Sequence, residues 1–418
     1  MRREEHARTS SGNDTRGSPL TPHTSRAKLI LKPAREKSLK RRHPWVFAGA
    51  IARVEGKPES GETVELRAAD GALLAVAAYS PESQIRARVW DWHAREIDAA
   101  FFFERITQAA HARTNLLNSG VTNSARLVHG ESDGLPGLIA DQYGDTVVVQ
   151  LLAAGAERWR DAIADALNAL PGVACVWERS DADVRTLEGL SARSGLLRGA
   201  APIGPLIIHE HGLQFKIEIE AGHKTGYYLD QRDNHLFLKN ISKDAVLLDC
   251  FCYSGGFALN ALAGGARAVT AIDSSGPALA LARENTRLNK LPEVEWIEGD
   301  VFQMLRKFRD AGRRFDIIVL DPPKLAPTAA HAEKASRAYK DANLLAFKLL
   351  TPGGVLMTYS CSGGVSADLF QKIVAGAALD AGVTASVEGW HHAAADHPLA
   401  LNFPEGEYLK GLVCRSTP

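Results

Sequence analysis

The chain has 418 residues, more than one hydrophobic core usually organises and enough for two or three domains. Hydrophobic residues make up 45% and charged residues 23%, with a net charge of +0, which excludes wholesale disorder. No apolar run approaches the ~20 residues of a membrane span, and the first residues lack the apolar stretch of a secretory signal. Five cysteines without a CxxC pair argue against a disulfide framework and a zinc site. We therefore expect a cytoplasmic enzyme without a metal and without a membrane partner.

Residues 1–26 show no apolar periodicity, which predicts a disordered tail. Residues 27–93 contain short strand-like runs separated by turn signals, which predicts a compact, barrel-like β module. Residues 28–42, called the basic segment below, are strongly cationic. The basic segment carries Lys28, Lys32, Arg35, Lys37, Lys40, Arg41 and Arg42 against Glu36. Such a segment fits either a polyanion-binding face or a solvated surface.

Residues 94–200 predict a small α+β module. Apolar positions at helical spacing predict a helix over 94–118, and two strand runs flank a Gly/Pro turn within 125–152. An amphipathic helix over 157–170 and a strand over 173–179 follow, and residues 200–205 resemble a linker.

Residues 201–418 begin with a strand or hairpin and then alternate between strands and helices. This alternation predicts a mostly parallel sheet with helices on both faces. Ligands of such sheets bind beyond the carboxyl ends of the strands.

Acidic residues stand at four successive predicted strand ends: Asp249, Asp273, Asp300 and Asp321. Gly255 and Gly256 follow the first of these strands, where paired glycines let a ligand approach the backbone closely. The spacing is not GxGxxG, so a dinucleotide fingerprint is absent. Each acidic residue alone also fits a helix N-cap, but the set of four favours a nucleoside-binding edge.

The motifs LLDCFCYSGGFALNALAGGARAVTAIDSS and DIIVLDPPK resemble those of class I S-adenosylmethionine-dependent methyltransferases. GHKTGYYLDQRDN, YSCSGG, HPLALNFPEGEYLKG and KSLKRRHPWVFAGAI narrow the resemblance to the bacterial 23S rRNA large-subunit methyltransferase I group. The resemblance extends from Lys28 to the end of the chain and implies a PUA domain, a central α+β domain and a catalytic α/β domain of Rossmann-like class I type. It implies methylation of carbon 5 of a cytosine in 23S rRNA.

Read onto this chain, the resemblance predicts three sets of site residues. Those predicted for the S-adenosylmethionine site are Asp249, Phe251, Ser254, Gly255, Gly256, Asp273, Ser274, Asp300, Val301, Gln231 and Arg232. The predicted catalytic residues are Cys361 and Asp321. Those predicted to bind RNA are Lys37, Lys40, Arg41, Arg42 and Trp45, with Phe47 interpreted as barrel core.

Carbon 5 of cytosine is a poor nucleophile, and addition of a thiolate to carbon 6 activates it. Cys361 follows a predicted strand between two serines, whereas a structural cysteine would be a small buried hydrophobe. Lys324 stands where amine methyltransferases carry an aromatic residue, which disfavours amine methylation. Glu405 is a candidate for the base that removes the carbon-5 proton, by position alone.

Two alternatives stay open at this point: a 5-methyluridine methyltransferase, which also uses a nucleophilic cysteine, and a non-catalytic rRNA-binding assembly factor. A homodimer also stays open. Cys250 and Cys252 are interpreted as packing residues. His391, His392 and His397 lack partners at metal-ligand spacing and are interpreted as surface or capping groups.

Overall fold

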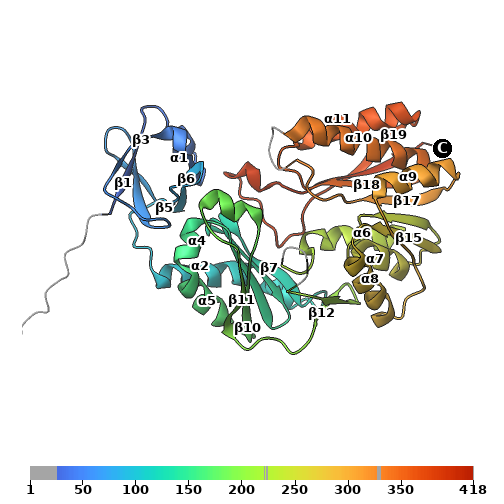
Figure 1. Cartoon of the computed structure of the whole chain (residues 1–418), viewed down its shortest axis with the longest axis horizontal. Coiled ribbons are helices and arrows are strands. Elements are labelled where there is room, and N and C mark those ends of the chain that lie inside the picture. Colours follow the sequence, from blue (N-terminus) through green and yellow to red (C-terminus); the bar gives the residue numbers. More distant parts are fainter. Residues whose placement is uncertain (1–25, 221, 223–224, 327–330, 418) are drawn as a thin grey trace, which may run out of the picture.

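The computed structural model describes residues 26–220, 222, 225–326 and 331–417. The tail predicted over 1–26 therefore lies, except for Arg26, outside the described residues. Figure 1 shows three modules: a blue N-terminal sheet, a green central module and a C-terminal module coloured from yellow to red. Among the described residues, no helix is both long and apolar enough to cross a bilayer.

The N-terminal module is a six-stranded sheet with the order β2-β6-β5-β4-β1-β3, antiparallel except where β1 pairs with β4. Alternation along β4 buries Val64 and Leu66 and leaves their neighbours half-exposed, as expected of a strand with one face toward a core. This confirms the barrel-like β prediction. The elements are β1 (Lys28–Leu31), α1 (Lys37–Lys40), β2 (Trp45–Phe47), η1 (Ala48–Ala50), β3 (Ile51–Glu55), β4 (Thr63–Arg67), β5 (Leu73–Tyr79) and β6 (Ile85–Asp91).

The central module is a five-stranded sheet, β11-β10-β9-β8-β7, with helices α2 and α5 packed together on it. Its elements are α2 (Ala99–Ala112), α3 (Thr114–Leu117), β7 (Ser124–His129), η2 (Gly130–Asp133), β8 (Leu138–Tyr143), β9 (Thr146–Leu151), α4 (Ala154–Arg158), α5 (Arg160–Asn168), β10 (Cys175–Ser180), η3 (Asp183–Glu188) and β11 (Arg193–Gly199).

Three sequence predictions for the central module need correction. The region 125–152 holds three strands, not two, because Gly144 (φ 63°) turns the chain between Tyr143 and Thr146, which pair across a two-residue loop. The predicted helix over 94–118 begins only after Asp98, whose side chain caps the N–H of Phe101 at 2.9 Å. Strand β11 was not predicted.

The C-terminal module begins with the hairpin β12 (Leu206–Glu210) and β13 (Leu213–Ile217) and continues as a seven-stranded sheet. The sheet order is β16-β15-β14-β17-β18-β20-β19, and β20 runs antiparallel to both of its neighbours. In Figure 1, α6, α7 and α8 lie on one face of the sheet and α9, α10 and α11 on the other. The mostly parallel sheet is confirmed, whereas helix α6 was not predicted.

The remaining elements of the C-terminal module are η4 (Leu229–Gln231), α6 (Arg232–Ile241), β14 (Val246–Cys250), α7 (Gly256–Ala263), β15 (Ala268–Asp273), α8 (Gly276–Leu288), β16 (Glu295–Glu298), α9 (Val301–Asp310), β17 (Phe315–Leu320), α10 (Ala332–Leu349), β18 (Leu350–Ser360), α11 (Ala367–Ala381), β19 (Ala385–His391), η6 (Pro404–Gly406) and β20 (Lys410–Ser416).

The three modules share their hydrophobic cores. Trp90 of β6 packs in one cluster with Phe101 and Phe102 of α2. A Cβ on Gly155 would lie 2.7 Å from the Trp90 ring, so the glycine permits the close approach of α4 to the N-terminal sheet. Tyr143 of β8 likewise belongs to the core of the C-terminal module. Shared cores fix the orientation of the modules.

Residues 392–409, between β19 and β20, form a long connection that we call the strap; it reaches the other two modules (Figure 1). Asp396 accepts the backbone N–H of Arg126 at 2.8 Å in the central module. Glu405 contacts His43 of the N-terminal module at 3.0 Å. The strap therefore joins the catalytic sheet to both modules that precede it.

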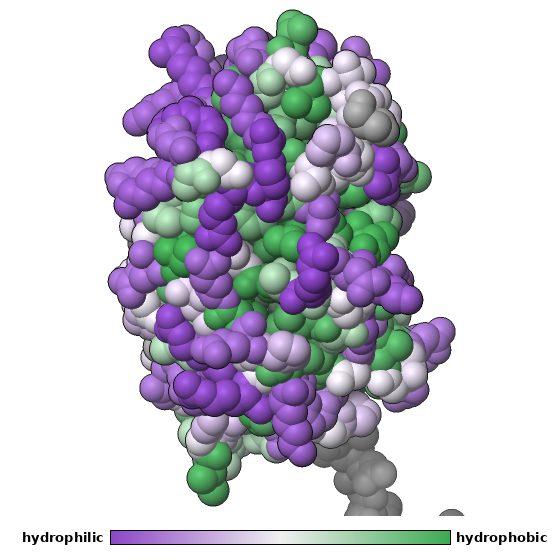
Figure 2. All heavy atoms as spheres, turned by 90° about the vertical axis from the view of Figure 1, so that its right-hand side faces the viewer, coloured by the Kyte–Doolittle hydropathy of each residue, from purple (hydrophilic) through white to green (hydrophobic). Residues whose placement is uncertain are grey.

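The surface of the C-terminal module is mixed. Figure 2 views this end of the molecule, where hydrophilic side chains project over much of the face and smaller apolar areas lie between them. Trp390, on the edge strand β19, is one of the large apolar side chains that remain exposed.

Candidate active site

The loop between β14 and α7 has a left-handed backbone at Phe251, Tyr253 and Gly255, with φ values of 65°, 46° and 88°. A Cβ on Gly255 would lie 2.8 Å from Leu259, and one on Gly256 would lie 2.6 Å from His235 Nε2. Both glycines are therefore required by close packing beneath the loop. Ser254, between Tyr253 and Gly255, is buried. We call residues 251–256 the glycine loop.

Asp249 lies in β14, directly before the glycine loop, and is fully buried. Its Oδ2 accepts the N–H of Ala258 at 3.0 Å, while its Oδ1 has no hydrogen-bond partner among the described residues. Burial raises the pKa of Asp249 to about 8, and the charges of Asp321 and Asp273 act in the same direction. A buried carboxyl with an unpartnered oxygen beside a glycine loop can form a hydrogen bond with a ligand.

Asp273, at the end of β15, braces the glycine loop. Its Oδ2 accepts the N–H of Tyr253 and its Oδ1 that of Ser275, both at 2.9 Å. Ser275, rather than Asp273, caps helix α8 by accepting the N–H of Ala278 at 3.3 Å. The helix-cap alternative for Asp273 is therefore wrong, and its carboxylate faces the loop.

The third strand end differs from the first two. Asp300 follows β16 and caps helix α9, with its Oδ1 2.8 Å from the N–H of Gln303. Val301 is buried in the core on the α10 side of the sheet, and Ser274 is exposed. At this strand end the Asp300 carboxylate already serves as a helix cap.

Gln231 and Arg232, adjacent in sequence, point to different partners. Gln231 donates to Asp321 Oδ2 at 2.9 Å and accepts from Asn234 at 2.6 Å. Arg232 is buried in an ion pair with Asp396 of the strap at 2.7 Å. Gln231 therefore belongs beside the Asp-Pro-Pro loop, and Arg232 holds the strap, which removes the reason for assigning it to the donor site.

Cys361 follows β18 and is half-buried, with its Sγ 3.8 Å from the carbonyl oxygen of Pro322. The serines on either side of it are fully buried. Ser362 Oγ accepts the N–H groups of Leu325 and Ala326 at 3.1 and 2.9 Å. The cysteine segment is thus tied to the Asp-Pro-Pro-Lys segment, which places Cys361 and Asp321 at one edge of the sheet.

Two tyrosines complete this edge. Tyr339 of α10 lies 2.9 Å from the hydroxyls of both Ser360 and Ser362. Burial raises the pKa of Tyr228, and the charges of Asp321 and Cys361 act in the same direction. Neither tyrosine was among the predicted site residues, although Tyr228 lies in the GHKTGYYLDQRDN motif, because nothing in the sequence shows which strand edge they approach. The only local sequence feature that pointed to hydrogen-bond partners near Cys361 was the pair of serines on either side of it, at the end of an apolar strand.

The other cysteines are buried. Burial raises the pKa of Cys250 and Cys252 well above the ordinary thiol value and that of Cys414 to about 12. The packing interpretation of Cys250 and Cys252 is confirmed. Cys361 is the one thiol among the described residues that is only half-buried, and partial exposure is what a nucleophile requires.

The histidines and Glu405 have structural partners. No cluster of three or more potential metal ligands occurs among the described residues. His391 lies 2.8 Å from the Tyr359 hydroxyl. His397 is buried against Asp396, so its interpretation as a surface or capping group is wrong. Glu405 is engaged with His43, which removes the reason for naming it as a base.

The predicted RNA-binding cations are exposed on and beside α1. They are Lys37, Lys40, Arg41 and Arg42. Lys40 is 3.3 Å from Glu36, and the Arg42 guanidinium lies 5.3 Å from the centre of the Trp92 ring.

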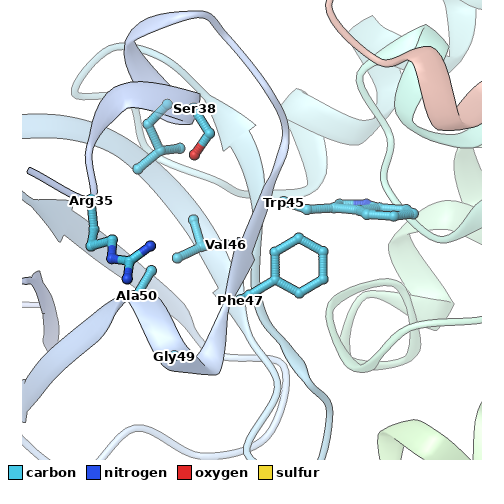
Figure 3. Close-up of a pocket in the computed structure, with 8 residues that line it drawn as sticks. Arg35, Ser38, Trp45, Val46, Phe47, Gly49 and Ala50 are labelled. Carbon is cyan, nitrogen blue, oxygen red and sulfur yellow. The ribbon is translucent and has the colours of Figure 1, made fainter.

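The sequence suggested that Trp45 contacts RNA and that Phe47 packs in the barrel core, but in the structure Trp45 is the packed residue and Phe47 the exposed one. The Trp45 indole donates to Glu131 at 2.7 Å and packs on Phe403 of the strap, 4.8 Å between ring centres. Phe47 is 51% exposed, so its assignment to the barrel core is wrong. Alternation along β2 buries Val46 and directs Phe47 outward, beside a hollow of about 320 Å³ whose lining includes Arg35 (Figure 3).

A glycine loop, an acidic residue at the next strand end and a half-buried cysteine beside an Asp-Pro-Pro segment define a methyltransferase that uses S-adenosylmethionine. Residues 29–92 match the PUA-like domain family, and residues 125–389 match the S-adenosylmethionine-dependent methyltransferase family. The ribosomal RNA large subunit methyltransferase I of Klebsiella pneumoniae strain 342 is 50% identical over 391 residues, covering 93% of this chain and 98% of the relative. That of Escherichia coli O157:H7 is 49% identical over 391 residues, covering 93% and 99%. The chain belongs to the ribosomal RNA large subunit methyltransferase I family.

The fold agrees with a solved structure. A putative S-adenosylmethionine-dependent methyltransferase from Streptococcus mutans superposes with a TM-score of 0.81 at 21% identity, over 93% of this chain and 99% of the other. A second structure, described as a putative methyltransferase complexed with SAH, gives the same TM-score, identity and coverage. These two similarities support the fold.

Proposed function

We propose that this large-subunit rRNA methyltransferase modifies carbon 5 of a cytosine and that Cys361 forms a covalent bond to carbon 6 of that base. The observation that carries the proposal is the half-buried Cys361, tied by Ser362 to the segment that bears Asp321. A nucleophile and a carboxyl on one strand edge suit a base that needs both covalent activation and orientation.

The proposed donor site comprises the glycine loop with Asp249 and Asp273. The unpartnered buried Oδ1 of Asp249, beside the glycine loop, fits a polar ligand bound at this strand end. Asp273 can accept ribose hydroxyls with the lone pairs that the two backbone N–H groups leave. When bound, S-adenosylmethionine supplies an electrophilic methyl group.

Cys361 provides the activation of the base. Attack of its thiolate on carbon 6 moves the electron pair of the 5,6 double bond to carbon 5, which becomes nucleophilic. After carbon 5 is methylated, its proton passes to water. The electron pair of that C–H bond re-forms the double bond and expels the Cys361 sulfur, which restores the thiolate.

Asp321 orients the base. Its Oδ2 accepts from Gln231 at 2.9 Å, which fixes the plane of the carboxyl. A fixed carboxylate can accept the exocyclic amine of cytosine, a donor that uracil lacks. This contact favours cytosine over the 5-methyluridine alternative.

We propose that residues 27–93 bind the rRNA backbone through the basic segment, that 94–200 connect them to the catalytic module, and that 201–418 carry out the transfer. Cationic side chains give affinity through phosphates, while the exposed Phe47 offers a face for stacking a base. The target cytosine must be unpaired or extruded to reach Cys361. The homodimer stays a prediction, which light scattering of the purified protein measures.

The test is the identity of the product. Large-subunit rRNA from cells lacking the enzyme is incubated with the protein and S-adenosylmethionine, digested to nucleosides and analysed by mass spectrometry. We expect 5-methylcytidine. Formation of 5-methyluridine or of an amine-methylated nucleoside in its place would overturn the proposal.

A further inference from the structure

Lys410, the first residue of β20, is buried beside the cysteine segment. It pairs in register with Ser360, the residue before Cys361, and Lys410 as a whole residue is 4% exposed. Lysine is among the residues least often buried, because removing its ammonium group from water is costly unless partners compensate. A buried lysine at this position therefore calls for an explanation.

The ammonium group of Lys410 contacts the nucleophile's own segment. Its Nζ donates to the carbonyl oxygen of Ser362, the residue after Cys361, at 2.9 Å. Lys410 therefore contacts the residues on both sides of Cys361: it pairs with Ser360 through the strand and binds Ser362 through its side chain. Lysine carries three donor hydrogens, so one carbonyl does not exhaust its capacity to interact.

Charges on several elements surround this position. Burial lowers the pKa of Lys410 and the exposed Lys324 acts in the same direction, whereas Cys361 and Glu407 act to raise it. Lys410 and Cys361 are therefore within electrostatic range of each other.

Asp321 is an acidic group that acts on the same two tyrosines as Cys361, and burial is the main cause of the raised pKa values of Tyr228 and Tyr339. Lys324 is exposed, so water and salt screen its field. Lys410 is thus a buried positive charge within electrostatic range of the thiol, and burial strengthens its effect.

We propose that Lys410 is a positioning residue for Cys361, whose buried ammonium group stabilises the thiolate and holds the cysteine segment through the carbonyl of Ser362. The thiol proton passes to water before RNA binds, so no base is required for that step. The inference rests on the proposed function in taking Cys361 as the nucleophile.

The test is the pH dependence of Cys361 alkylation in the full-length protein without RNA. Iodoacetamide forms an S–C bond with the thiolate and releases iodide, and peptide mass spectrometry reads the extent at Cys361. We expect the parent midpoint to lie below the ordinary thiol value of about 8.5. In Lys410→Met the midpoint should rise by about 1 pH unit. Lys410→Arg keeps the charge and should leave it nearly unchanged.

Lys324→Met is the matched control, because it removes an exposed lysine whose charge acts on Lys410 itself, and it should shift the midpoint less. If the alkylation midpoint of the parent protein lies at or above about pH 8.5, that result alone overturns the proposal, without any variant. An unchanged midpoint in folded Lys410→Met, or a larger shift in Lys324→Met, overturns it too.

Turnover separates this inference from the proposed function. At pH 7, Lys410→Met should lower kcat about tenfold without changing KM for the donor, and raising the pH should restore kcat. A lysine with only a structural role would give a loss that pH does not rescue, which contradicts the inference. A product other than 5-methylcytidine would overturn the proposed function while leaving the alkylation result intact.

Discussion

In the proposed donor site, Asp249 and Asp273 accept backbone N–H groups from the glycine loop or its helix, within 20 residues of themselves in sequence. On the base side, Asp321 and Cys361 are positioned by Gln231, Ser362 and Lys410, and the Gln231–Asp321 contact spans 90 residues. Because the contacts of the donor site are local, a short sequence motif is enough to predict the residues of the donor side. The base side depends on the assembled sheet, so perturbations of the two sides should be separable.

The largest expected effect breaks the base side alone. Cys361→Ala should lower methyl transfer by about a thousandfold or more, because covalent activation is lost. Donor affinity, measured by calorimetry, should change little. Cys414→Ala removes a buried thiol from the adjacent strand and should keep activity at some cost in melting temperature. Substantial activity in Cys361→Ala would show that the thiol is not the nucleophile.

Asp273→Ala breaks the donor side. Loss of two charge-assisted hydrogen bonds to ribose, each contributing ~1.5–3 kcal/mol, should lower donor affinity by about a hundredfold or more. RNA affinity should barely move. The matched control is Ser275→Ala, which removes the cap of α8 and should cost ~1 kcal/mol of stability without weakening donor binding. Equal donor affinities in the two variants would contradict the assignment of Asp273.

Reversing the charges of Lys37, Lys40 and Arg42 tests a surface remote from both sides. RNA affinity should fall, and each lost phosphate contact should reduce the log–log salt slope by somewhat under ~1. Reversal of Lys307 and Arg309, on helix α9 of the catalytic module, provides the control and should leave the slope alone. Slopes that are the same in both variants would mean that the basic segment is only a solvated face.

The last prediction concerns stability rather than activity or binding, namely its pH dependence on the donor side. The Asp249 pKa of about 8 means that the folded state keeps a proton that the unfolded state loses near its ordinary value of 3.8. The parent should therefore lose stability as pH rises through this window. The side chain in Asp249→Asn cannot ionise. The melting temperature of this variant, relative to that of the parent, should therefore rise between pH 5 and 8. A constant difference would mean that Asp249 is ionised in the folded protein.

Much of the C-terminal sheet was predictable, because each apolar strand run is followed by a turn and an amphipathic helix. Strand β11 was missed because its sequence, with Gly195 and Gly199 at positive φ, resembles a loop. Helix α6 was missed because its first residues coincide with the GHKTGYYLDQRDN motif. The periodicity of apolar residues is not enough to predict elements such as these two.

Individual site residues also divide into those that the sequence could predict and those whose partners depend on the assembled fold. The place of Asp273 beside the glycine loop could be anticipated from its position at a strand end, but its bond to the Tyr253 N–H could not. The turn of Arg232 toward Asp396, 164 residues away, could not. Phe47 shows that a hydrophobic residue in a three-residue strand has no periodicity long enough to assign its face. The burial of Lys410 depends on an antiparallel strand that only the assembled sheet supplies.

The most direct test of the account is a covalent complex with RNA that carries 5-fluorocytidine at the methylated position. Fluorine at carbon 5 cannot leave as a proton does, so the thiolate attached to carbon 6 cannot be expelled after methyl transfer. We predict a stable protein–RNA adduct that requires S-adenosylmethionine and maps to Cys361 by peptide mass spectrometry. An RNA that is methylated without forming an adduct, or an adduct at another residue, would contradict the account.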